Sequence, residues 1–148
     1  MTTTSPTTAV RAGGTRTTPP PSPRQGPYVC GLDAAMDVVS GKWKALILWE
    51  LEEHGVRRYA EMRRGLPGVS DKVLAQQLRE MEADGLLVRE VFPEVPPRVE
   101  YSLTEHGSAL NTALGALGDW GQDRIERLQA PAPAETAGGR QGSGWRAS

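Results

Sequence analysis

The spacing of apolar residues predicts two helices at the start of the main body of the chain. The first covers residues 33–41, with Asp33 as its N-cap and a glycine at its end. The second covers residues 42–55 and also stops at a glycine. Its apolar residues recur at helical spacing, which predicts a buried stripe made of Trp43, Leu46, Ile47 and Leu51.

Two more helices follow, separated by a turn. Residues 57–68 have a short helical pattern that glycine and proline close. Residues 70–85 predict a longer helix, with Ser70 as N-cap, Asp71 at the positive end of the helix dipole and Gly85 at the stop. Its inward face is predicted to consist of Val73, Leu74, Leu78 and Met81.

Residues 86–92 and 98–103 are typical of two β-strands. The Pro-rich segment 93–97 joins them as a stiff turn that cannot continue a sheet ladder. The order helix, turn, helix, hairpin is that of a winged helix-turn-helix, a mainly α fold with a small β-hairpin (α+β). In that fold the second helix enters the major groove of DNA, and the hairpin lies over neighbouring backbone or minor groove.

The last predicted helix opens at Thr104 and runs to about residue 128. Its apolar stripe is too long for a small winged domain to cover, and glycines recur along one ridge where a second backbone could approach closely. We therefore expect a homodimer. The expected interface residues are Leu110, Leu114, Leu117, Gly118, Gly121 and Ile125.

The two ends of the chain differ in composition from the body. Residues 1–27 are rich in Thr and Pro, and residues 129–148 in Ala, Pro, Gly and Ser, so both are expected to be disordered. The winged domain and its dimerisation helix are expected to occupy residues 28–128. With 148 residues, 38% hydrophobic and 24% charged, the chain has room for one soluble domain and two tails.

Composition also excludes several classes of protein. The longest apolar run, residues 45–49, is far short of a membrane span, and the N-terminus lacks the pattern of a secretory signal. A single cysteine rules out an internal disulfide, and with two histidines it argues against structural zinc. No cofactor is implied, and the cytoplasm is the expected location.

One face of the 70–85 helix has the chemistry of DNA recognition. It carries Lys72, Ala75, Gln76 and Arg79, which can bind phosphate, touch a thymine methyl, read adenine and read guanine. The alternative is an ordinary solvated helix face. Local charge favours DNA: residues 57–79 hold six cations against two carboxylates, although the whole chain has a net charge of −1.

Together these motifs resemble the bacterial HxlR-type (MarR-like) winged-helix transcriptional regulators. The resemblance covers about residues 30–122 and rests on motifs at Cys30, 41–43, 63–70, 78–86 and 93–101. It implies a homodimer that binds a palindromic double-stranded operator. It places Ser70, Lys72, Gln76 and Arg79 on the recognition helix and Arg98 on the wing; the basic segment adds Arg57 and Arg58 as expected DNA contacts.

Some members of that family use a cysteine at the position of Cys30 to sense oxidants or electrophiles, so an oxidant or small-molecule inducer is a further implied partner. From the residues alone, a single cysteine is more often a small buried hydrophobe than a sensor.

The alternative function from another class is a winged-helix module that binds protein through the same surface. An enzyme is not expected, because neither histidine lies in a motif that supports a catalytic triad.

Overall fold

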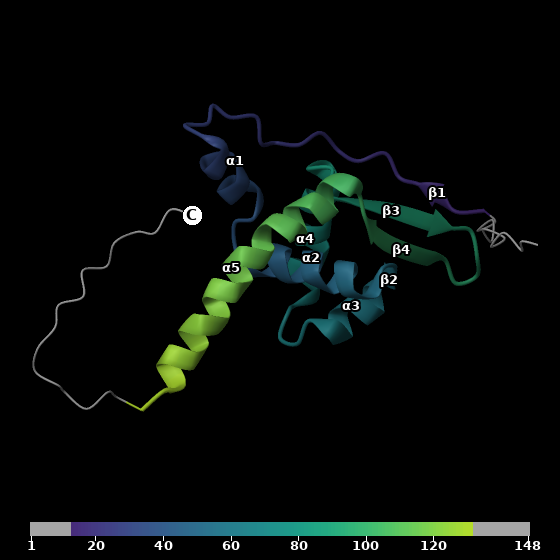
Figure 1. Cartoon of the computed structure of the whole chain (residues 1–148). Coiled ribbons are helices and arrows are strands. Elements are labelled where there is room, and N and C mark those ends of the chain that lie inside the picture. The colour runs from purple at the N-terminus through teal and green to yellow at the C-terminus, as the bar shows by residue number, and fades with distance from the viewer. Residues whose placement is uncertain (1–12, 132–148) are drawn as a thin grey trace, which may run out of the picture. The chain divides into compact units, whose positions relative to one another are not determined.

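The structure is a computed structural model, and it describes residues 13–131. Its elements are β1 (Thr15–Arg16), α1 (Gly31–Val38), α2 (Lys42–His54), β2 (Arg57–Arg58), α3 (Tyr59–Gly65), α4 (Asp71–Ala83), β3 (Leu87–Phe92), β4 (Arg98–Leu103) and α5 (Glu105–Gln129) (Figure 1). Five helices with a small antiparallel sheet confirm the winged helix-turn-helix fold predicted from the sequence.

The sheet has the strand order β1-β3-β4-β2, and all its pairings are antiparallel. Its centre is the β3–β4 hairpin, which pairs residues 87–92 with 98–103 as the sequence predicted. The short strand β2 lies on one edge of the hairpin, with Arg57 opposite Tyr101, and connects directly to α3. This edge pairing fixes the start of α3 against the hairpin.

The hydrophobic core lies between α2, α3, α4 and the hairpin. Its fully buried side chains include Ile47, Leu48, Met62, Leu74 and Met81. Burying an aliphatic side chain of this size stabilises the fold by about 1.5–3 kcal/mol relative to leaving it in water. The core therefore holds α4 firmly by one face and leaves its other face to solvent.

Three details of the predicted helices are wrong. Leu46 is 40% exposed, and Leu48, which was not assigned to the buried stripe, is completely buried. Val73 is 36% exposed, because it lies about 100° round α4 from Leu74, at the edge of the buried face. The N-cap of the first helix is Cys30 instead of Asp33, whose carboxylate accepts a hydrogen bond from the Val29 backbone N–H.

The segment before α1 also differs from the expectation that residues 1–27 lack structure. Residues 13–27, the N-terminal arm, run along the sheet and α4 (Figure 1). Thr15 and Arg16 pair with Val91 and Glu90 of β3, so the arm adds a strand to the outer edge of the hairpin. The arm is polar. Backbone pairing and ion pairs, and not the packing of apolar side chains, hold it in position. Residues 1–12 and 132–148 lie outside the described part of the chain.

The chain divides into two compact units, residues 1–115 and 116–148. The helix α5 begins in the first unit, where Thr104 caps it by accepting a hydrogen bond from the Gly107 N–H, as predicted. Gly107 is buried, and a Cβ added there would lie 1.9 Å from the Leu86 carbonyl oxygen. Only glycine allows α5 to begin this close to the hairpin. No helix within residues 13–131 has the length and apolar character required to cross a membrane.

Candidate nucleic-acid interface

The turn between α3 and α4 is fixed by one acidic residue. Ser70 caps α4 by accepting a hydrogen bond from the Val73 N–H at 3.2 Å, as predicted. Next to it, the Asp71 carboxylate accepts a hydrogen bond from the Tyr59 hydroxyl and forms an ion pair with Arg63 at 2.9 Å. Burial, and then the hydrogen bond to Asp71, raise the pKa of the Tyr59 hydroxyl, so it remains a donor. These contacts set the geometry of the helix-turn-helix.

The outward face of α4 carries the side chains that the sequence proposed for base recognition. Lys72, Gln76 and Arg79 are exposed, and Ala75 is half-buried beside them. Arg79 donates to the Gln76 side-chain oxygen at 3.1 Å, and the Gln76 amide donates to Glu80 at 3.0 Å. The two long side chains are therefore held against each other on one surface of the helix.

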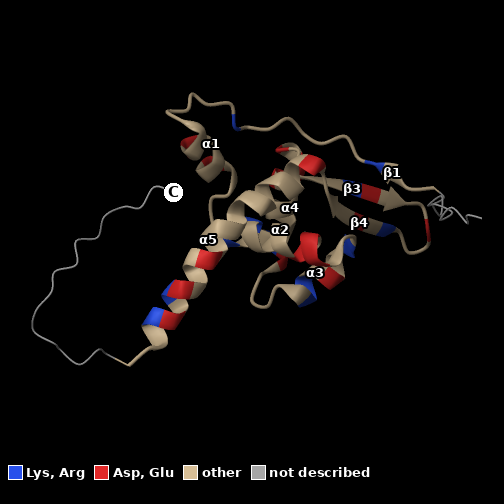
Figure 2. Cartoon of the chain, in the orientation of Figure 1, with Lys and Arg blue, Asp and Glu red and all other residues tan. Residues whose placement is uncertain are grey.

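Some of the basic residues on this side have no acidic partner among residues 13–131. Lys72, Arg58 and Arg64 are exposed, and none of them takes part in an ion pair there. Figure 2 shows basic residues on and next to α3, with acidic residues beside them. Unpaired, solvated cations can exchange water for phosphate oxygens at little cost. Lys72, Arg58 and Arg64 are therefore the cations that are free to bind a phosphate backbone.

Arg57 was expected to contact DNA, but the structure gives it a different environment. It is largely buried and forms ion pairs with Glu61 at 3.1 Å and with the buried Glu50 at 3.5 Å. A hydrogen bond from the Arg58 backbone N–H, together with Arg57, lowers the pKa of Glu61, which keeps it charged. Through these two ion pairs Arg57, which lies on β2, is linked to Glu50 of α2 and to Glu61 of α3.

Arg98 has a similar position at the base of the hairpin loop. It forms ion pairs with Glu94 at 3.2 Å and Glu100 at 3.4 Å, and its guanidinium lies 4.2 Å from the centre of the Phe92 ring. The exposed tip of the loop is formed by Glu94 and Val95, so it carries an acid where a wing contact to phosphate would need a cation. Arg98 therefore organises the wing.

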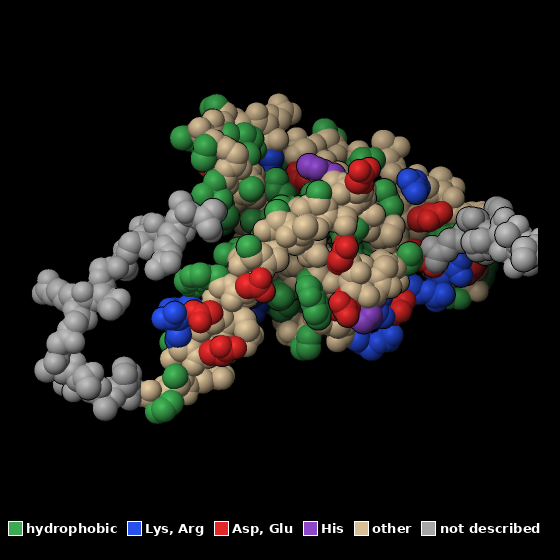
Figure 3. Space-filling model, in the orientation of Figure 1, with side chains coloured by type: hydrophobic (Ala, Val, Ile, Leu, Met, Phe, Trp, Pro, Cys, Tyr) green, Lys and Arg blue, Asp and Glu red, His purple; other side chains and the backbone are tan. Residues whose placement is uncertain are grey.

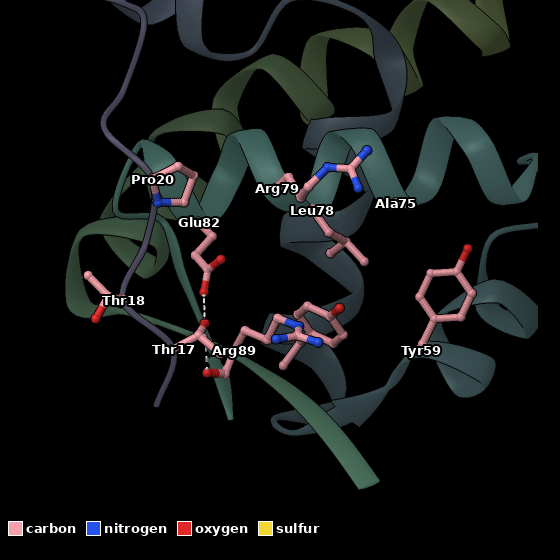
Figure 4. A pocket seen from close by; sticks show the side chains of 10 residues that line it. Thr17, Thr18, Pro20, Tyr59, Ala75, Leu78, Arg79, Glu82 and Arg89 are labelled. Atoms are coloured by element: carbon pink, nitrogen blue, oxygen red, sulfur yellow. Dashed lines mark hydrogen bonds between the residues drawn. The ribbon is translucent and has the colours of Figure 1, made fainter. Parts of the chain in front are cut away.

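A residue that was not predicted lies beside α4. Arg89 of β3 and Arg79 of α4 both line a cavity of about 360 Å³, with Tyr59, Ala75 and the arm residue Thr17 on its other sides (Figure 4). Within the described residues the Arg89 side chain forms no ion pair. The alternation of side chains along a strand could have identified this residue. Arg89 lies two residues after the buried Leu87, so both fall on the face of β3 that points toward the helices.

Cys30 is exposed and is the N-cap of α1. The helix that follows it has no buried residue, and Leu32 and Met36 on this helix are 70% and 52% exposed. Figure 3 shows apolar side chains on the surface in this region. The thiol is accessible and adjoins an apolar surface.

The residues expected at a dimer interface fall into two groups. Leu110 and Leu114 are half-buried against the core of their own chain, so they stabilise the fold of the protomer itself. Leu117 and Ile125 are 57% and 48% exposed, and Trp120 and Leu128 on the same helix are also exposed. At Gly118 and Gly121 an added Cβ would meet no atom within 4 Å.

The residues and geometry above agree with the comparison to known families. Residues 38–129 match the model of the family described as HxlR-like helix-turn-helix. The chain belongs to this family. YdeP, an HTH-type transcriptional regulator of Bacillus subtilis (strain 168), is 42% identical over 109 residues, which are 72% of this chain and 84% of YdeP.

Solved structures show the same similarity. The redox regulator HypR in its reduced form is 39% identical with a TM-score of 0.62, covering 68% of this chain and 98% of HypR. A MarR-family transcriptional regulator from Enterococcus faecalis V583 is 44% identical with a TM-score of 0.58, covering 66% of this chain and 88% of that chain. The family consists of transcriptional regulators and not enzymes, as the sequence predicted.

Proposed function

We propose that this HxlR-like regulator binds a palindromic operator as a homodimer, with α4 in the major groove of each half-site. The observation that carries the proposal is the exposed face of α4. It presents Lys72, Gln76 and Arg79 side by side, while the opposite face is buried in the core. A capped, rigidly packed helix with these groups outward is the reading element of helix-turn-helix proteins.

The residues have different roles in this proposal. Gln76 and Arg79 have the amide and guanidinium groups that pair with adenine and guanine edges, and Ala75 offers a methyl group to thymine. Lys72 and Arg58 bind phosphates and set affinity without reading sequence. Ser70 orients the start of α4 through its cap.

Arg57 and Arg98, whose charges are already paired with carboxylates, position β2 and the wing instead of binding DNA directly. Arg89 becomes a candidate contact because it lines the same cavity as Arg79 and has no acidic partner in the described part of the chain.

The homodimer is supported by apolar side chains that the described residues leave uncovered. Leu32 and Met36 on α1, and Leu117, Trp120 and Leu128 on α5, are more than half exposed. On each helix taken by itself, large exposed apolar side chains mark a surface for another protein. A second copy of the chain matches a two-fold operator.

Thiol oxidation at Cys30 is the proposed input signal. The thiol is exposed, and HypR, which has the same fold, is a redox regulator with solved reduced and oxidised forms. An oxidant such as diamide would take two electrons and two protons from two Cys30 thiols and leave one disulfide between the protomers. Direct bridging requires the two Cα atoms to lie within about 7 Å. The family match begins at residue 38, so Cys30 lies outside it and needs its own test.

The experiment that separates DNA binding from a protein-binding module is salt dependence. Operator DNA is selected from a random pool, and its affinity is measured by fluorescence anisotropy between about 50 and 200 mM salt. We expect a steep slope of log affinity against log salt. Lys72→Ala should reduce this slope by about 1.8, because a homodimer loses two phosphate contacts and each contributes about 0.9. A wild-type protein with no salt-dependent affinity for any DNA would favour the protein-binding module.

Cys30 is tested in the same assay with diamide. Treatment should change operator affinity in the wild type and leave Cys30→Ser unaffected. Unchanged affinity in protein with confirmed modification of Cys30 would contradict redox control.

A further inference from the structure

The C-terminal half of α4 is acidic next to the proposed reading residues. Glu80, Glu82 and Asp84 follow Gln76 and Arg79 along the helix and its C-cap. The helix dipole adds partial negative charge at the same end. Left uncompensated, these carboxylates would repel a phosphate backbone within a Debye length of about 8–10 Å.

The N-terminal arm contacts all three carboxylates. The Thr17 hydroxyl donates to Glu82, and the Ser22 hydroxyl donates to Asp84. Arg24 forms ion pairs with Asp84 at 2.9 Å and with Glu80 at 3.1 Å, and its side chain is only 15% exposed. The arm reaches this position because Thr15 and Arg16 pair with β3, which directs the following residues across the end of α4 (Figure 4).

Arg24 is also linked to the reading residues through Glu80. One oxygen of Glu80 contacts Arg24 and the buried Lys44, and the other accepts the hydrogen bond from the Gln76 amide. Gln76 in turn accepts a hydrogen bond from Arg79. A continuous chain of polar contacts therefore runs from the arm to the two side chains proposed to read bases.

We propose that the N-terminal arm is a working part of the DNA-reading surface, with Arg24 as a positioning residue. Arg24 neutralises the carboxylates at the end of α4 and, through Glu80, holds Gln76 and Arg79 in place for the major groove. The arm lies outside residues 38–129, the part matched to the family, so it supplements the shared domain. The proposal rests on the function proposed above, in which α4 binds DNA.

The test uses the full-length chain and three variants, Arg24→Gln, Arg24→Lys and Arg16→Gln. Arg16 is the matched control, because it is an exposed arginine of the same arm that forms no ion pair with the acids of α4. Operator affinity is measured at about 50 and 200 mM salt, and base preference is measured at each operator position.

We expect Arg24→Gln to weaken binding at low salt by about tenfold. The homodimer carries two copies of Arg24, and one effective charge contributes about threefold between those salt concentrations. It should also relax the preference at the position read by Gln76. Arg24→Lys should restore most of the affinity, and Arg16→Gln should keep the base preference of the wild type. A fourth variant, Asp84→Asn, keeps Arg24 and removes one carboxylate, so it should bind DNA more tightly than the wild type at low salt.

Each result bears on one of the two proposals. Wild-type affinity and base preference in Arg24→Gln would overturn the role of the arm while leaving DNA binding by α4 intact. If Arg24→Gln does not fold, as judged by circular dichroism, Asp84→Asn decides, and equal or weaker DNA binding in that variant overturns the proposal. A wild-type chain that binds no DNA would overturn the proposed function itself.

Discussion

Lys44 is the side chain whose environment gives the sharpest stability prediction. It lies on α2 with 1% of its side chain exposed, and its ammonium nitrogen is 2.5 Å from a carboxylate oxygen of Glu80 on α4. Glu80 is 26% exposed and also has Arg24 as a partner. The two members of this pair therefore depend on each other unequally: Lys44 has one carboxylate, whereas Glu80 has a second cation and access to water.

This asymmetry predicts different costs for the two single substitutions. Glu80→Ala leaves a buried ammonium without a counter-charge and should reduce the free energy of unfolding by about 3–5 kcal/mol. Lys44→Met removes the buried charge and keeps the volume apolar, so it should change that free energy by less than about 1 kcal/mol, or increase it. The double variant Lys44→Met/Glu80→Ala should be more stable than Glu80→Ala alone.

The assay is urea unfolding followed by tryptophan fluorescence and circular dichroism at neutral pH. Glu53→Ala is the matched control, since Glu53 is exposed on α2 and forms no ion pair with the described residues; it should change stability by less than about 0.5 kcal/mol. If Lys44→Met proves at least as destabilising as Glu80→Ala, or if the two costs simply add, the buried pair does not have the energetics argued here.

Three further predictions concern pH, packing and assembly. Lys44, then Gln76, lower the pKa of Glu80 to about 2 from 4.5, so the contribution of Glu80 to stability is complete above about pH 5 and is lost as pH falls toward 2. Acid titration of unfolding should show a loss on the order of 2 kcal/mol in the wild type and a smaller loss in Lys44→Met, where Gln76 and Arg24 still hydrogen-bond to Glu80. Gly107→Ala should lower the free energy of unfolding by about 1–3 kcal/mol or more, measured with urea, because its Cβ would overlap the Leu86 carbonyl. Gly118→Leu should leave the protomer folded, because a side chain at this position meets only open space in the protomer. It should weaken the dimer in sedimentation, because the added side chain would clash with the second copy. A well-folded wild-type monomer would contradict the proposed interface.

The parts of the fold that sequence could predict are those with local signals. Ser70 marks the start of α4 because a cap needs only a hydroxyl three residues before the N–H that it binds. The hairpin could be placed because β-branched strands flank a proline-rich turn. The outward set Lys72, Gln76 and Arg79 followed from helical spacing once the buried face was known.

The parts that could not be predicted depend on distant partners. The buried stripe of α2 was assigned to Leu46 and not to Leu48, and it did not include Lys44. Glu80, which allows Lys44 to be buried, comes much later in the chain. The arm has almost no apolar residues, and its order comes from the open edge of β3 and from acids on α4. Arg57 was assigned to DNA because its second partner, the buried Glu50, lies on another element, and Arg98 because its contact with the Phe92 ring depends on the pairing of the hairpin.

The claim that α4 reads DNA is tested most directly by exchanging one of its outward side chains. The wild type, Gln76→Ala and Gln77→Ala are each used to select binding sites from the same random DNA pool. Gln77 is the matched control, since it is the neighbouring glutamine of α4 and is half-buried, away from the outward face.

We predict that the wild type selects a two-fold symmetric site, with half-sites separated by about one helical turn or a multiple of it. Gln76→Ala should lose preference at one symmetric pair of positions, at a cost of about 1–3 kcal/mol per half-site in affinity for the wild-type site. Gln77→Ala should select the wild-type site. Identical sites and affinities for the wild type and Gln76→Ala would contradict the account.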